Sequence, residues 1–189
     1  MRQNLARRAA LVDAAIEVLA RDGARGLTFR AVDAQAEVPV GTASNYFDNR
    51  DDLLTQAGGR IYERLQPDER TTAESLAGPR TKERIVELMR DIVGRITAFR
   101  TGWLALLELR LEATRRPELR AVLTERIRED AEANVRYHLE SGLPGDETTV
   151  KLLYLSMNWL IVEQLTLPDL LTDDEVQNLI AAAVERSLP

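Results

Sequence analysis

Cysteine is absent from this 189-residue sequence, and histidine occurs once, as His138. Without thiols the chain has no disulfides, thiolate metal ligands or cysteine nucleophile, and one histidine cannot form a histidine metal cluster. The carboxylates are scattered, and no sequence motif brings acid–base or nucleophilic groups together. We therefore expect no metal, no cofactor and no enzymatic activity, and we expect His138 to be a surface residue of a charged helix.

Long hydrophobic runs are also missing. The longest uncharged apolar run, Leu152 to Val162, covers 11 residues, whereas a membrane-spanning helix needs about 20. Near the N-terminus, Asp13 and Glu17 interrupt what would be the apolar core of a signal peptide. The lack of cysteine suits a reducing compartment. We therefore expect a cytoplasmic protein with no membrane contact.

Excess charge is confined to one part of the chain. Hydrophobic residues make up 44% of the sequence and charged residues 30%, which favours a folded domain with a packed core over disorder. The net charge is −6, but residues 1–65 hold nine arginines and nine acidic residues and sum to zero. A nucleic acid would therefore meet least repulsion at the first third of the chain.

Strand patterns are absent too, and helical periodicity fills the chain. Apolar residues follow steps of three and four in most segments, and no alternating run bounded by turn signals occurs. The segments 102–114 and 148–165 are apolar on nearly every side, which is typical of helices in the centre of a bundle. The sequence predicts an all-α fold of about nine helices, with Pro117 in the first turn of one of them.

A polar stretch with two prolines and a glycine, residues 66–80, reads as a linker. It separates a predicted DNA-binding unit, residues 1–65, from a predicted ligand-binding and dimerisation bundle, residues 81–189. Because the first unit is small, we expect its last helix, from about Asn49 to Leu65, to pack onto the bundle.

Residues 28–50 have the layout of a helix-turn-helix. A first short helix begins after the N-cap Thr28 and a second is expected from about Val40 to Phe47, joined to the first by a tight turn. We call residues 40–47 the recognition segment. Its small and polar residues would form an outer face that fits the major groove, where such side chains bond or contact base edges. These residues are Gly41, Thr42, Ala43, Ser44 and Asn45.

This segment resembles the tetracycline-repressor (TetR) family of bacterial transcriptional regulators. The family pattern is Leu-Thr-x-Arg before the first helix, Gly-Thr opening the second, His or Tyr followed by Phe closing it, and a basic residue three positions later. The matching residues are Leu27, Thr28, Arg30, Gly41, Thr42, Tyr46, Phe47 and Arg50. The resemblance implies DNA contacts from Thr28, Arg30, Val40, Gly41, Thr42, Ala43, Ser44, Asn45, Tyr46 and Arg50.

The resemblance also implies partners. A member of the family would bind a palindromic double-stranded operator as a homodimer, paired through its last two helices, here about 148–165 and 173–187. It would hold a small hydrophobic inducer within residues 81–165. Residues that could line such a pocket are Met89, Trp103, Leu107, Arg110, Tyr154, Asn158 and Trp159; the apolar ones could equally be core, and the polar ones could satisfy a neighbouring helix.

Four positions depart from the family pattern. Glu37 stands where a turn glycine is usual, so a left-handed backbone there would be strained. Pro39 replaces a capping serine, Ser44 replaces an aromatic residue, and Asp33 replaces an alanine on a side that we expect to face solvent.

Several roles stay open at this point. Arg50 could contact phosphate or pair with acidic neighbours such as Asp51, and Tyr46 could be a lid over Phe47. Arg7 and Arg8 could be solvated charges or DNA contacts. The leading hypothesis is a ligand-responsive repressor, and the alternative is a small-molecule- or partner-binding helical protein without a DNA role.

Overall fold

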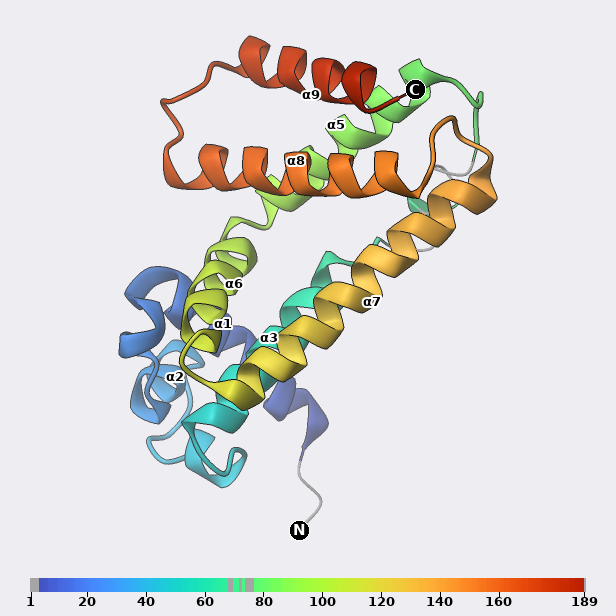
Figure 1. Ribbon diagram of the computed structural model, residues 1–189. Coiled ribbons are helices and arrows are strands. Elements are labelled where there is room, and N and C mark those ends of the chain that lie inside the picture. Colours follow the sequence, from blue (N-terminus) through green and yellow to red (C-terminus); the bar gives the residue numbers. More distant parts are fainter. Residues whose placement is uncertain (1–3, 68–69, 72, 74–76, 189) are drawn as a thin grey trace. The chain divides into compact units, whose positions relative to one another are not determined.

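The computed structural model describes residues 4–67, 70–71, 73 and 77–188 (Figure 1). Within these residues the chain forms eight α-helices, one 3₁₀ helix (η1) and no strand, which confirms the predicted all-α class. The elements are α1 (Leu5–Gly26), α2 (Phe29–Gln35), η1 (Ala43–Asn45), α3 (Arg50–Leu65), α5 (Lys82–Ala98), α6 (Arg100–Ala113), α7 (Pro117–Ser141), α8 (Glu147–Thr166) and α9 (Asp173–Ser187).

The helices belong to two compact units. Met1–Gln66 and Phe99–Arg126 form the first, and Pro67–Ala98 and Ile127–Pro189 form the second. This division differs from the predicted one, because α6 and the start of α7 pack with the N-terminal helices rather than with the rest of the predicted bundle. Part of the predicted linker, residues 68–69, 72 and 74–76, lies outside the described residues, so the linker stays a prediction.

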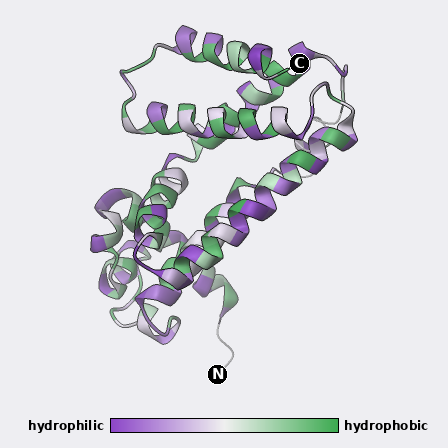
Figure 2. Cartoon of the chain, in the orientation of Figure 1, coloured by the Kyte–Doolittle hydropathy of each residue, from purple (hydrophilic) through white to green (hydrophobic). Residues whose placement is uncertain are grey.

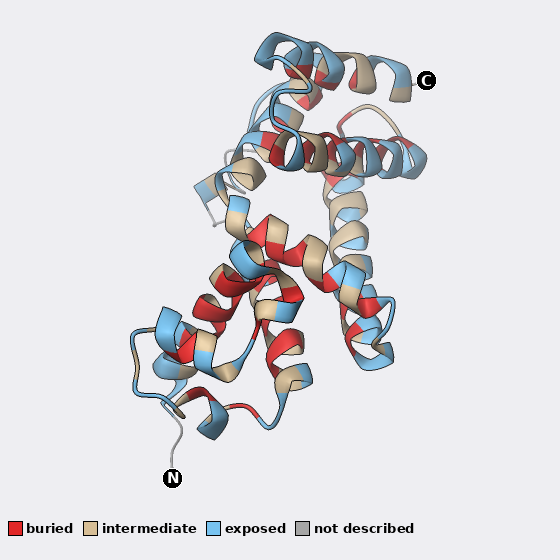
Figure 3. Ribbon diagram, turned by 90° about the vertical axis from the view of Figure 1, so that its left-hand side faces the viewer, coloured by how far each residue is buried: buried red, intermediate tan, exposed pale blue. Residues whose placement is uncertain are grey.

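The first unit is built around α1, which contacts α2, α3 and α6. Buried residues gather on the inward sides of these helices (Figure 3). Leu11, Ile16 and Leu19 of α1 are fully buried, as are Leu53 of α3 and Leu109 of α6. Helix α3 contacts α6 within this unit, and the expected packing of the Asn49–Leu65 helix onto a separate bundle stays a prediction.

The second unit joins α5, α8 and α9, each of which contacts the other two. Its core cluster includes Ile85 and Leu88 of α5, Leu153 of α8 and Val184 of α9. Hydrophobic residues run along much of α8 (Figure 2). None of the described helices is both long and apolar enough to cross a membrane.

Local sequence signals explain where several helices begin. Thr28 accepts a hydrogen bond from the backbone N–H of Ala31 at 3.1 Å, so the predicted N-cap is confirmed. Asn49 caps α3 in the same way through the N–H of Asp52. Helix α7 begins at Pro117, as the sequence predicts, because the first helical position needs no N–H donor.

Candidate nucleic-acid interface

The recognition segment is shorter as a helix than the sequence predicts. A helix was expected from about Val40 to Phe47, but the structure has one 3₁₀ turn, Ala43–Asn45. Pro39 has no N–H to donate, and Gly41 is left-handed with φ 92°, so a regular helix cannot start before Thr42. The N–H groups of Tyr46 and Phe47 both bond to the carbonyl of Ala43, which closes the turn.

A carboxylate from α2 holds the start of this turn. Asp33 accepts hydrogen bonds from the N–H groups of Gly41 and Ala43, both at 2.7 Å, and only 1% of its surface is exposed. The prediction that Asp33 faces solvent is therefore wrong. Because α2 and the recognition segment meet closely, a short side chain on α2 can reach N–H groups that have no helical partner.

The turn after α2 places Glu37 in the left-handed region, where we expect strain for a residue other than glycine. Glu37 is left-handed, with φ 54°. The N–H of Glu37 bonds to the carbonyl of Ala34, and that of Val38 bonds to the carbonyl of Asp33. This is the paired bonding of a Schellman motif, whose left-handed position glycine occupies at lowest cost.

The outer side of the recognition segment carries small and polar side chains. Val40 is 79% exposed, and Ser44 and Asn45 are exposed too. The Ser44 hydroxyl and the Asn45 amide both donate to the carbonyl of Gly41, at 2.9 Å each. These donors are thus held close to the backbone on the face that the sequence assigned to base contacts.

One predicted contact residue, Ala43, has a different position from the one expected. Ala43 is fully buried, so its placement on the outer face was wrong: its methyl group packs inward while its N–H meets Asp33. Thr42 is half-buried, and its hydroxyl donates to the carbonyl of Pro39.

Two arginines near the segment donate hydrogen bonds to backbone carbonyl groups, and one of these carbonyls belongs to the segment itself. Arg50 donates through Nε to the carbonyl of Leu27 at 3.0 Å and through Nη2 to that of Ala24. Arg8 donates to the carbonyl of Tyr46 at 2.7 Å and lies 5.0 Å from the centre of the Phe47 ring. Arg8 is therefore neither a freely solvated charge nor positioned only for DNA, and a phosphate contact by Arg50 stays a prediction.

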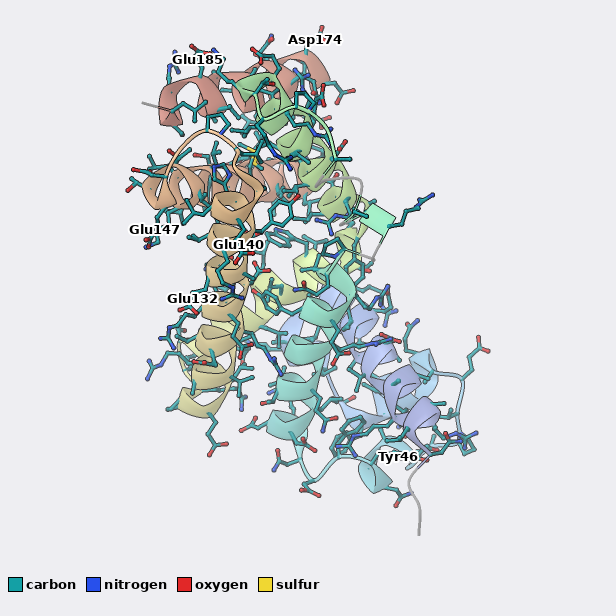
Figure 4. All side chains as sticks on the ribbon, turned by 90° about the vertical axis from the view of Figure 1, so that its right-hand side faces the viewer. Tyr46, Glu132, Glu140, Glu147, Asp174 and Glu185 are labelled. Carbon is teal, nitrogen blue, oxygen red and sulfur yellow. The ribbon has the colours of Figure 1, made fainter. Side chains whose placement is uncertain are left out.

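The remaining predicted contact residues lie on either side of the recognition turn. Thr28 and Arg30, on the first turn of α2, are exposed, and Tyr46 is half-buried. Figure 4 labels Tyr46, which directly follows η1 and precedes α3. Sequence reasoning did not identify Asp33 or Arg8 as supports of this site; their signal would have been a polar residue on a helix side that must be buried.

The seven predicted pocket residues divide between the units, so a single pocket stays a prediction. In the first unit Trp103 is buried, Leu107 is half-buried and Arg110 is exposed. In the second unit Met89, Tyr154 and Asn158 are half-buried. Two surface hollows of about 230 and 320 Å³ are lined by other residues.

Three side chains of the second unit have surroundings that differ from those expected of them. Trp159 is 65% exposed, so its placement as a pocket wall is wrong within this unit. The Asn158 amide donates to the carbonyl of Tyr154 one turn earlier, at 2.6 Å, which satisfies it within its own helix. His138 is 7% exposed rather than a surface residue, and its Nε2 lies 3.0 Å from the carbonyl oxygen of Pro144.

Comparisons with known proteins agree with this geometry. Residues 11–57 match the family model "Bacterial regulatory proteins, tetR family", and residues 80–189 match "Tetracyclin repressor-like, C-terminal domain". The HTH-type transcriptional repressor KstR of Mycolicibacterium smegmatis is 35% identical over 79 residues, which are 42% of this chain. That stretch spans 38% of the length of KstR.

Solved structures are similar over almost the whole chain. A TetR family member from Streptomyces coelicolor A3, SCO1917, is 30% identical with a TM-score of 0.71, covering 97% of this chain and 98% of that one. The multidrug binding protein EbrR, complexed with ethidium, is 28% identical with a TM-score of 0.70 and full coverage of both chains. With the family model matched over residues 80–189, the chain belongs to the TetR family of bacterial transcriptional regulators.

Proposed function

We propose that this regulator is a ligand-responsive repressor that binds a palindromic operator as a homodimer, in the cytoplasm where bacterial DNA lies. The observation that carries the proposal is the recognition segment, which is exposed and polar outside but braced inside by Asp33 and Arg8. An exposed polar turn contributes little to core packing, whereas an element that reads the major groove must be rigid and narrow.

The outer residues have the chemistry to read bases and grip the backbone. Asn45 can bond an adenine edge in two places, Ser44 can bond either base, and the exposed Val40 can contact a thymine methyl group. Asn45 and Ser44 would first release the Gly41 carbonyl, which costs about 1 kcal/mol per bond because the group is open to water. Thr28 and Arg30 would contact phosphate.

The homodimer would form through α8 and α9. Leu152, Leu155 and Trp159 of α8 are 48%, 65% and 65% exposed, and Leu179 of α9 is 45% exposed. The three α8 residues recur at steps of three and four, so they form one apolar stripe. Such a stripe favours an interface, and a two-fold interface would present one recognition segment to each half of a palindrome.

The dimer can be tested by light scattering at micromolar concentration. We expect the wild type to be a dimer and Trp159→Glu to be a monomer that has lost most of its operator affinity. Leu167→Glu is the matched control, since Leu167 is 58% exposed but lies beyond the end of α8. A monomeric wild type would refute this part of the proposal.

The inducer would be a largely hydrophobic small molecule. The relative EbrR is described as a multidrug binding protein, complexed with ethidium, malachite green or imidazole. For induction, the ligand must bind the DNA-incompetent arrangement more tightly than the competent one. Because the chain has two tryptophans, Trp159→Phe leaves the buried Trp103 as the sole reporter of binding. Ethidium and malachite green should quench Trp103 and weaken operator binding at the same concentrations.

Selection from a random duplex pool tests the function as a whole. Wild-type protein should enrich an inverted repeat and bind it, in a fluorescence anisotropy titration, on the order of 10³-fold more tightly than random duplex. If no sequence is enriched while a small molecule still binds, the helical ligand-binding protein without a DNA role is the better account.

A further inference from the structure

Helix α6 of the first unit carries a row of polar residues on one face; Figure 1 shows where this helix lies. Thr101, Glu108 and Glu112 are separated by seven and four residues, so they share one side of the helix. The Thr101 hydroxyl donates to Glu17 of α1 at 3.0 Å. Glu108 and Glu112 are each connected by hydrogen bonds, through one intermediate residue, to the first residues of α3.

Glu108 binds the backbone at the end of α1. Its Oε2 accepts from the N–H of Ala24 at 2.9 Å, and Ala24 is 3% exposed. The approach depends on Gly23, which is left-handed with φ 69° and where a Cβ atom would lie 3.2 Å from the same oxygen. The chain thus departs from helical geometry at the residue before the N–H that Glu108 accepts.

Arg50 binds carbonyl groups of the same backbone segment. Its Nη2 donates to the carbonyl of Ala24 and its Nε to that of Leu27. Arg50 is the first residue of α3, and only Asp48 and Asn49 separate it from the recognition segment. Glu108, the Ala24–Leu27 backbone and Arg50 therefore form a continuous series of hydrogen bonds from α6 to the first residue of α3, three positions after Phe47 at the end of the recognition segment.

A second connection starts from the same face of α6. Glu112 accepts from Arg116 Nε at 2.8 Å, and Arg116 also pairs with Asp51, the residue after Arg50. Two adjacent residues at the start of α3 are thus both tied to α6. A rigid connection of this kind can fix where the recognition segment lies relative to α6.

We propose that Glu108 is a positioning residue for operator binding: it sets the recognition segment through the Ala24–Leu27 backbone and Arg50 without contacting DNA. The inference rests on the proposed function, because it concerns how tightly the operator is held. The property that matters is the reach of its oxygen to the Ala24 N–H. The negative charge itself matters less, since a neutral amide oxygen also accepts from an N–H.

Two conservative variants separate reach from charge. Glu108→Gln keeps the length and an acceptor oxygen but removes the charge, whereas Glu108→Asp keeps the charge but is one methylene too short. We expect Glu108→Asp to bind the selected operator about tenfold more weakly, as loss of one charge-assisted hydrogen bond implies, and Glu108→Gln to stay within about threefold of wild type. Binding to random duplex should be nearly unchanged in both. Glu118→Gln, an exposed residue of α7, is the matched charge control.

A combination with Arg50→Lys tests the connection itself. If both residues act through one backbone segment, the double variant Glu108→Asp with Arg50→Lys should lose clearly less affinity than the product of the single losses. Independent losses would overturn the proposal, as would full affinity in Glu108→Asp, or equal losses on operator and random duplex. If the wild type selects no operator, the proposed function fails instead, which is a distinguishable result.

Discussion

Removing the Asp33 carboxylate should unfold the recognition segment before the rest of the first unit. In Asp33→Ala, two N–H groups lose their charge-assisted bonds, each 2.7 Å long. The N–H of Ala43 belongs to a fully buried residue, while Gly41 is half-exposed and can bond water instead. A bond to a charged group contributes about 1.5–3 kcal/mol, so one bond lost in full and one in part gives about 2–4 kcal/mol.

Urea unfolding followed by circular dichroism measures this loss, and amide hydrogen exchange locates it. Asp33→Asn should lose less, about 1–2 kcal/mol, because one oxygen still accepts while the amide nitrogen opposes the second N–H. Asp48→Ala is the matched control, since Asp48 is exposed next to the same segment, and it should change stability by less than about 0.5 kcal/mol. A loss below 0.5 kcal/mol in Asp33→Ala would refute the capping role.

Two further stability predictions follow from single residues. Glu37→Gly should raise the free energy of unfolding by about 0.5–1 kcal/mol, because glycine adopts φ 54° without strain. The control Ala34→Gly, in the preceding helix, should lower the free energy of unfolding by about 1 kcal/mol. A destabilised Glu37→Gly would contradict the strain argument. Arg116 and Arg115 lower the pKa of Glu112 from 4.5 to about 2. The ionised Glu112 therefore stabilises the fold fully above about pH 4.5, and this stabilisation is lost as the pH falls toward 2. The contribution to the free energy of unfolding is about 1–2 kcal/mol, after a reduction for the exposure of Arg115 to water. In acid unfolding, the stability of Glu112→Gln should therefore fall less steeply between pH 4.5 and 2 than that of the wild type. An identical pH dependence of stability in both proteins would contradict this prediction.

The sequence was a good guide wherever local chemistry decides the structure. Thr28 as an N-cap and Pro117 in the first turn of a helix each depend on neighbours within a few positions, and each was found as predicted. The all-helical class followed from periodicity, which reports one buried side per helix.

The errors concern side chains whose surroundings are set by a neighbouring loop or by another element, which helical periodicity does not report. Asp33 and His138 were placed in solvent because charged and polar residues are usually exposed, yet each is buried against a backbone group brought close by the fold. Trp159 was placed in a pocket because it is large and apolar, but its side of α8 is left open. Periodicity shows that a helix has an apolar side without showing what covers it.

The extent of the recognition segment was missed for a different reason. The residue pattern suggested a helix from about Val40 to Phe47, but Pro39 and the left-handed Gly41 leave room for a single 3₁₀ turn. A turn this short depends on Asp33 of α2 for its first hydrogen bonds. A cap that another helix supplies cannot be predicted from the sequence of the turn itself.

Parallel selection with wild type and Asn45→Ala tests the central claim most directly, namely that the exposed side of the recognition segment reads operator bases. The wild type should enrich an inverted repeat. Asn45→Ala should enrich the same repeat with one base pair in each half-site no longer specified, at a cost of about 1–3 kcal/mol on the original site. An unchanged sequence preference in Asn45→Ala, or no enriched sequence for the wild type, would contradict the account.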